Sequence, residues 1–92
     1  MIEYEFIKRL EYLKLNFRVS VTEIDIYDVK DKRVLITVSR DSLIEFQVHH
    51  GFREEYWDSK EGEQLLLLVI DYAYTVPYDR GSIDINYLVR YN

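Results

Sequence analysis

Hydrophobic residues recur with helical spacing at the start of the chain. They fall three or four positions apart, at Ile2, Phe6, Leu10 and Leu13. This spacing places apolar side chains on one side of an α-helix, where they can pack against a core. No glycine or proline interrupts the segment. The pattern therefore predicts an amphipathic helix over residues 2–15.

Helical spacing then gives way to an alternation of apolar and polar residues. From position 17 onward every second residue is hydrophobic, as in a strand with one buried face. The alternation shifts by one position near Thr22 and Glu23. An extra residue in a β-bulge would produce this shift, and so would a division into two short strands. Residues 17–29 are predicted to be extended, and both forms remain open.

Residues 33–39 form the next alternating segment and are predicted to be a strand. One face of this strand would carry Val34, Ile36 and Val38. Leu35 would lie on the opposite face, because successive side chains of a strand point to opposite sides.

A tight turn is expected at Arg40 and Asp41, and a strand over residues 43–49 follows it. One face of that strand would carry Ile44, Phe46 and Val48. Short connections join strands that are antiparallel neighbours in a sheet. The alternating segments together therefore predict a three-stranded antiparallel meander.

A long hydrophobic run predicts a second helix over residues 64–74. Asp58 and Glu61 stand three positions apart ahead of it, in the arrangement of a capping box. One face of the helix would carry Leu65, Leu68, Val69 and Tyr72. The remaining sides are also largely apolar, at Leu66, Leu67 and Ile70. A helix that is apolar nearly all round is buried on two sides or covered by a partner.

The C-terminal segment fits two structures. Alternating β-branched and aromatic residues over 82–91 favour a strand, whereas Ser82 as a cap and Arg90 near the end suit a short helix. The complete order is helix, three-stranded meander, helix, and then a strand or short helix. This order predicts an α+β fold with helices on one face of the sheet. We expect residues 1–92 to form a single small domain.

Charge and composition limit the possible functions. The 92 residues carry a formal net charge of −5. Residues 1–40 hold eight Lys or Arg and seven Asp or Glu, a net of +1, and residues 41–92 hold four and ten, a net of −6. Direct nucleic-acid binding is not expected, because it needs clustered Lys and Arg. An acidic N-terminus and the lack of a long apolar run predict no signal peptide, no membrane segment and a cytoplasmic location.

The chain offers little catalytic or metal-binding chemistry. It has no cysteine, and its two histidines, His49 and His50, are adjacent. Adjacent strand residues point to opposite faces, so these imidazoles are not expected to share a metal ion. No serine lies in a Gly-x-Ser-x-Gly context, and the three glycines are too scattered for a phosphate loop. We predict no metal, no cofactor and no enzymatic activity.

Residues 51–58 are the most distinctive segment of the sequence. They combine three aromatic residues with three carboxylates: Phe52, Tyr56, Trp57, Glu54, Glu55 and Asp58. The acidic run continues with Glu61 and Glu63. Aromatic anchors beside carboxylates suit a surface that binds a basic protein. The alternatives are rings that complete the core and acids that solvate the start of a helix.

The same segment resembles a known family. Its pattern of Gly51-Phe52, Glu55-Tyr56 and Asp58 is similar to a Gly-aromatic, Glu-Tyr, Asp stretch in small acidic phage anti-CRISPR proteins. The order of a helix, three strands and a helical tail is also similar. The chain departs from that family in its milder net charge and in lacking a predicted helix before Gly51. The resemblance covers residues 51–58 and implies a phage protein that occupies the DNA-admitting groove of a CRISPR nuclease.

We therefore predict a non-enzymatic inhibitor or regulator that binds a protein partner. Carboxylates standing where DNA phosphates would lie could occupy a basic groove of that partner. The alternative is a small homo-oligomeric accessory protein of a phage or bacterium. In that case residues 65–70 would form the interface of a homodimer.

Overall fold

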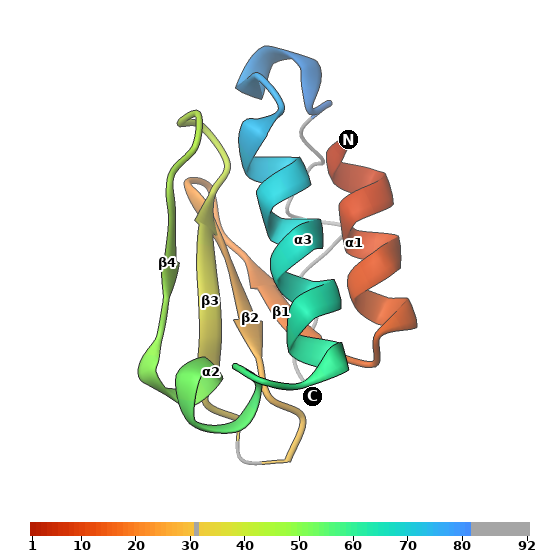
Figure 1. The fold of residues 1–92 in the computed structure, drawn as a ribbon. Coiled ribbons are helices and arrows are strands. Elements are labelled where there is room, and N and C mark those ends of the chain that lie inside the picture. The colour runs from red at the N-terminus through yellow and green to blue at the C-terminus, as the bar shows by residue number, and fades with distance from the viewer. Residues whose placement is uncertain (31, 82–92) are drawn as a thin grey trace.

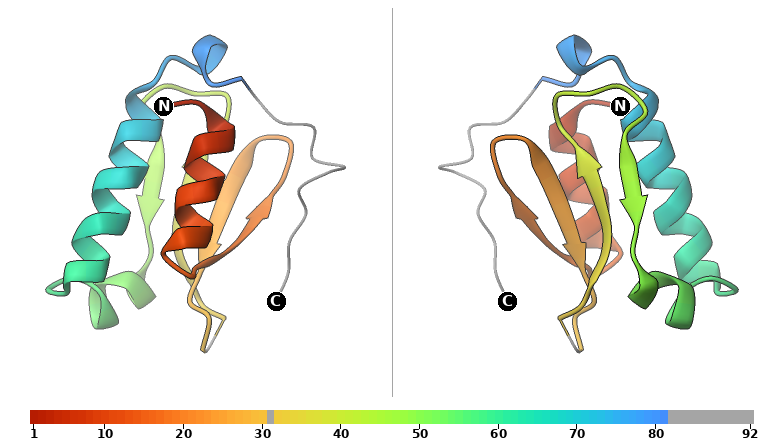
Figure 2. Two further views of the ribbon diagram at one scale, coloured as in Figure 1. Left: turned by 90° about the vertical axis from the view of Figure 1, so that its right-hand side faces the viewer. Right: turned by 90° about the vertical axis from the view of Figure 1, so that its left-hand side faces the viewer.

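The computed structural model describes residues 1–30 and 32–81 and confirms the α+β fold (Figure 1). Four antiparallel strands form one sheet in the order β1-β2-β3-β4. Two helices, α1 and α3, lie side by side over one face of this sheet. In the right-hand view of Figure 2 the sheet lies in front of both helices, so neither of them covers its other face. The predicted strand or helix over residues 82–91 lies outside the described residues.

Helix α1 (Glu3–Tyr12) confirms the first predicted helix. Phe6, Ile7 and Leu10 are buried on its inner side. The helix ends earlier than predicted because Lys14 adopts the left-handed conformation, with a φ of 61°. The amide of Lys14 bonds to the Glu11 carbonyl, and that of Leu15 bonds to the Leu10 carbonyl. This pair of bonds is a Schellman cap, which turns the chain toward the sheet.

The extended segment at residues 17–29 is two strands, β1 (Asn16–Val19) and β2 (Glu23–Tyr27). The Oγ atom of Ser20 both donates to the Glu23 carbonyl and accepts from the Glu23 amide, at 3.1 Å in each case. These bonds close a turn at the point where the alternation shifts. The second of the two sequence-based forms is therefore correct, and the sheet has four strands rather than three.

Strand β3 (Val34–Ser39) contains a β-bulge that the sequence did not indicate. Ile26 pairs with Ile36 whereas Tyr27 pairs with Val34, so Leu35 is an extra residue in the ladder. Leu35 and Ile36 are both fully buried. The prediction that Leu35 lies on the outer face was wrong, because a bulge interrupts the strict alternation of side chains.

Strand β4 (Phe46–Val48) is shorter than the predicted strand over residues 43–49. The prediction of a tight turn at Arg40 and Asp41 was also wrong. Ser39 Oγ accepts hydrogen bonds from the amides of Asp41 and Ser42, which opens a longer loop over residues 40–45. Ile44 in this loop has a φ of 55° and its amide bonds to the carbonyl of Ala73. The loop is thus tied to the end of α3 and cannot extend β4.

Helix α3 (Lys60–Tyr74) begins four residues before the predicted start. Its N-cap is Ser59, whose Oγ accepts from the Gly62 amide at 2.9 Å. The predicted capping box of Asp58 and Glu61 was therefore placed one residue early. The predicted inner face is confirmed, since it is buried at Leu65, Leu68, Val69 and Tyr72. Pro77 begins a short 3-10 helix, η1 (Pro77–Asp79), beyond the end of α3.

One hydrophobic core lies between the helices and the sheet. It is composed of Phe6, Ile7, Leu10, Phe17, Val19, Ile24, Ile26, Leu35, Ile36, Val38, Phe52, Leu65, Leu68, Val69, Tyr72 and Ala73. The opposite sheet face carries a polar row in which Arg18 pairs with Asp25 and Asp25 pairs with Thr37. This arrangement is the usual one for an antiparallel sheet with one covered face.

Candidate functional site

The distinctive segment at residues 51–58 lies at one end of the sheet. It forms helix α2 (His50–Glu55) and a following turn (Figure 1). The amide of Tyr56 bonds to the carbonyl of Phe52, one helical turn earlier. The same spacing lets the Phe52 and Tyr56 rings stack at a centroid distance of 6.0 Å. Packing of the two rings is the local reason for the helix.

The three aromatic residues have different environments. Phe52 is 1% exposed and belongs to the core, so the prediction that it anchors a partner was wrong. Phe52 has no polar tip that would hold it at the surface. Tyr56 is half-buried, and its hydroxyl donates to Asp28 Oδ2 at 3.2 Å. Trp57 is 60% exposed, which makes it the aromatic residue of this segment that is free to contact a partner.

The carboxylates of α2 are compensated by a nearby cation. The Arg33 guanidinium donates to Glu54 Oε1 at 2.9 Å and also to Glu55 Oε1. His50 Nε2 lies 3.4 Å from Glu54 Oε1 and adds a second pairing when it is protonated. Glu54 and Glu55 are about half exposed, but a basic partner would have to compete with Arg33 for them.

The remaining carboxylates lie at the start of α3 and are more available. Asp58, Glu61 and Glu63 are exposed, and no ion pair to any of them occurs within residues 1–30 and 32–81. Glu61 and Glu63 occupy the first turn of the helix, where the helix dipole favours negative charge. Together with Trp57 these three residues define a surface that we call the acidic surface.

A hollow of about 490 Å³ separates Trp57 from the first turns of α3. It is lined by Phe52, Trp57, Asp58, Ser59, Lys60, Gly62, Glu63 and Leu66. The ring of Phe52 meets the indole of Trp57 edge-on, with 6.4 Å between centroids and an interplanar angle of 88°. The indole therefore lines the same depression as the carboxylates of Asp58 and Glu63. We call this depression the Trp57 hollow.

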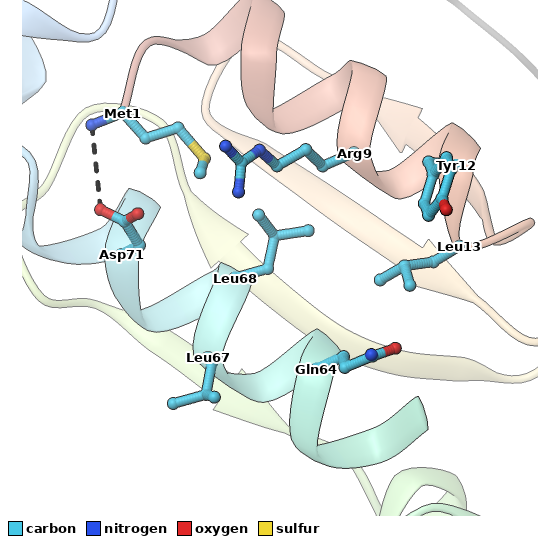
Figure 3. Close-up of a pocket in the computed structure, with 8 residues that line it drawn as sticks. All are labelled: Met1, Arg9, Tyr12, Leu13, Gln64, Leu67, Leu68 and Asp71. Atoms are coloured by element: carbon cyan, nitrogen blue, oxygen red, sulfur yellow. Dashed lines mark ion pairs between the residues drawn. The ribbon is translucent and has the colours of Figure 1, made fainter. Parts of the chain in front are cut away.

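A second depression of about 510 Å³ runs between α1 and α3 (Figure 3). It is lined by Met1, Arg9, Tyr12, Leu13, Gln64, Leu67, Leu68 and Asp71. Figure 3 shows Leu68 projecting toward α1, whereas Leu67 points away from it. Leu67 is 60% exposed and Tyr12 is 85% exposed. The outward side of α3 therefore carries apolar surface that the described residues leave uncovered.

The Met1 ammonium closes one end of this groove. It donates to Thr75 Oγ1 at 2.8 Å and lies 3.9 Å from Asp71 Oδ1. The bond links the start of α1 with the end of α3.

A buried polar cluster was not found from the sequence. Glu3 is fully buried and forms a two-pronged ion pair with Arg40, at 2.8 Å to Nε and 2.9 Å to the terminal nitrogen. The Tyr72 hydroxyl donates to the same carboxylate at 2.8 Å. Burial raises the pKa of Tyr72 above its usual value, and the bond to Glu3 acts in the same direction. The hydrogen bonds to Glu3 raise the pKa of Arg40.

Arg80 completes the cluster on the other side of Tyr72. Its guanidinium lies 4.5 Å from the centre of the Tyr72 ring. Its donors reach four backbone carbonyls, those of Ser39, Ser42, Ala73 and Thr75. The cluster is fully buried at Glu3, Tyr72 and Arg80. Its carboxylate, hydroxyl and guanidinium groups are therefore not accessible to a substrate from solution. Its role is to join α1, α3 and the loop over residues 40–45.

The histidines lie apart from one another. His49 Nε2 contacts Thr37 Oγ1 at 2.8 Å on the sheet face opposite α1 and α3, and Thr37 Oγ1 donates to Asp25 Oδ1 at 2.7 Å. His50 instead approaches Glu54 on α2. Within the described ranges no group of three or more His, Cys, Asp or Glu side chains could hold a metal ion. No helix in those ranges has the length and apolar character needed to cross a membrane.

The acidic surface is the part of the predicted site that the structure brings together. Trp57, Asp58 and Glu63 surround the hollow, and Glu61 lies on the next flank of α3 beside Glu55 and Tyr56. Phe52 supports this surface from the core. No known protein family matches the chain, and comparison with curated proteins and with solved structures found no significant match.

Proposed function

We propose that this chain is a non-enzymatic inhibitor or regulator that binds a protein partner through the acidic surface. The partner would present a basic, nucleic-acid-binding groove, as a CRISPR nuclease does, and the chain would act from a phage inside the bacterial cytoplasm. The observation that carries the proposal is an exposed Trp57 beside three carboxylates without an ion-pair partner within the described residues.

Each part of the surface has a physical role in binding. Uncompensated carboxylates attract a basic groove from a distance and raise the association rate, most strongly at low salt. Trp57 can bury a large area on contact with little loss of side-chain freedom. Glu54 and Glu55 are expected to contribute less, because Arg33 already holds them. The mechanism is occlusion of the groove.

The first prediction is that reversing the charges of the acidic surface strongly weakens binding. A variant with Asp58→Lys, Glu61→Lys and Glu63→Lys should recover the partner from host lysate at least about tenfold less well than the wild type, because three attractive charges become repulsive. Capture followed by quantitative mass spectrometry measures this loss. Double-stranded DNA should displace the captured partner, because it competes for the same groove.

The matched control replaces three other carboxylates with lysine at the opposite end of the molecule, so the total change in charge is the same. Glu23→Lys, Glu45→Lys and Asp79→Lys alter exposed carboxylates in β2, in the loop over residues 40–45 and in η1. The turn between β1 and β2, the loop over residues 40–45 and η1 all lie at the end of the sheet away from α2 (Figure 1). This control should keep the partner. Equal recovery by both triple variants would refute the role of the acidic surface.

A second candidate function is favoured by the uncovered side of α3. Leu67 is 60% exposed and the half-buried residues Leu66 and Ile70 flank it. If the chain is a homo-oligomeric accessory protein, this side would pack against a second copy. Analytical ultracentrifugation should then show a concentration-dependent dimer that Leu67→Lys converts to a monomer, whereas Tyr78→Lys, a change at a fully exposed residue of η1, has no effect. A monomer at every concentration would rule out this function.

A further inference from the structure

We infer that the Trp57 hollow receives one arginine side chain of the partner protein. The inference rests on the proposed function and adds the chemical group that the site recognises. The guanidinium would lie against the indole of Trp57, and its N–H groups would donate to the carboxylates of Asp58 and Glu63.

The indole supplies the first half of the recognition. Tryptophan is the best aromatic partner for a cation placed over its ring. Trp57 is 60% exposed, and its indole meets the ring of Phe52 edge-on, which leaves ring surface open to a ligand. A flat guanidinium can stack on such a ring, whereas a compact ammonium cannot. Phe52 and Leu66 line the same hollow and suit the aliphatic stem of the arginine.

The carboxylates supply the second half. Asp58 and Glu63 both line the hollow and make no ion pair within the described part of the chain. Lys60 also lines it, and the positive end of the α3 dipole lies nearby. Two carboxylates against one ammonium still leave the hollow negative. A guanidinium is less strongly hydrated than an ammonium and binds a carboxylate with two parallel bonds, so arginine gains more here than lysine.

The dimensions of the hollow agree with this occupant. Its volume of about 490 Å³ exceeds what a single ring or methyl group needs. Sites for small ligands range over roughly 300–1,000 Å³. A whole arginine side chain with part of its backbone therefore has room in it.

Trp57 is the single tryptophan of the chain, so its fluorescence reports on the hollow directly. The probes are three capped peptides in which glycine alternates with arginine, with lysine, or with citrulline, the neutral isostere of arginine. Excitation at the red edge of the indole band avoids the tyrosines. We expect the arginine peptide to change the emission saturably and to bind at least about tenfold more tightly than the lysine peptide. The citrulline peptide should not bind.

Two variants with equal change in charge test the position of the bound group. Asp58→Asn with Glu63→Gln should remove the preference for arginine, whereas Asp41→Asn with Asp79→Asn, at exposed positions far from the hollow, should keep it. Equal affinity for the arginine and lysine peptides would overturn the inference and leave a diffuse acidic surface intact. The absence of binding by the arginine peptide would overturn it too. The proposed function itself fails only in the capture experiment with the lysine variants.

Discussion

Replacing Glu3 with alanine should destabilise the folded protein by about 3–5 kcal/mol, as removal of one partner from a buried ion pair generally does. The Glu3 carboxylate accepts hydrogen bonds from the Arg40 guanidinium at both of its oxygens and from the Tyr72 hydroxyl. Without it the buried Arg40 guanidinium keeps its charge, because arginine does not lose its proton in proteins. Urea unfolding followed by circular dichroism gives the change in the free energy of unfolding.

Glu5 is the matched control in the same helix. Its carboxylate accepts from Arg9 at 2.8 Å, but both side chains are about half exposed. Glu5→Ala should therefore change stability by no more than about 0.5 kcal/mol, the usual contribution of an exposed pair one helical turn apart. If Glu3→Ala and Glu5→Ala were equally mild, the buried cluster would not be what joins α1 to the loop over residues 40–45.

Replacing Gly62 with alanine should both destabilise the protein and displace Trp57. A Cβ atom at position 62 would lie 1.8 Å from the carbonyl oxygen of Tyr56 and 2.7 Å from its carbonyl carbon. These are backbone atoms, so no side-chain rotation relieves the clash and the connection between α2 and α3 must move. Overpacking of this kind costs about 1–3 kcal/mol or more. Thermal unfolding and the emission maximum of Trp57 would report the two effects.

Gly51 provides the comparison for this substitution. A Cβ atom there would lie 3.6 Å from the nearest atoms of Arg33, which is an ordinary contact. Gly51→Ala should leave the Trp57 emission unchanged and keep or slightly raise stability, because alanine is the better helix former. If Gly62→Ala left the melting temperature and the emission at wild-type values, the close approach of Gly62 to Tyr56 would be refuted.

Local patterns were enough to predict most of the fold. The spacing of Leu65, Leu68 and Tyr72 fixes the buried side of α3, because a helix repeats every 3.6 residues whatever surrounds it. Alternation likewise identifies the strands. The position of the bulge at Leu35 was missed, since both Leu35 and its neighbour Ile36 are apolar and either could face inward. The bulge is fixed by pairing with β2, which is a contact between distant segments.

The buried polar cluster shows the same limit more strongly. Glu3 is 37 residues from Arg40 and 69 from Tyr72 along the chain, and in sequence it resembles any acid in the first turn of a helix. One signal was present. Tyr72 lies on the inner face of α3, and a buried tyrosine hydroxyl needs a hydrogen-bond partner. That requirement shows that a polar group must be near, but it does not say which.

Composition located the candidate site but not the roles of its residues. The segment containing Phe52 and Trp57 holds two large apolar rings, and only the packing of α2 against β3 shows that the first is buried and the second exposed. Arg33, which holds Glu54 and Glu55, comes from a segment more than 20 residues earlier. The carboxylates of the acidic surface therefore lie at the start of α3, and the pairing with Arg33 that sets Glu54 and Glu55 apart from them joins distant segments of the chain.

The ammonium of Met1 has a practical consequence for these experiments. It donates to Thr75 and approaches Asp71, so a fusion tag joined there would replace the charged donor by an amide and loosen α1 from α3. Site-specific immobilisation avoids this perturbation. The sequence lacks cysteine, so a thiol introduced by Leu43→Cys, at an exposed residue of the loop over residues 40–45, would be unique. Attached through that loop, the protein would present Trp57 outward from the support.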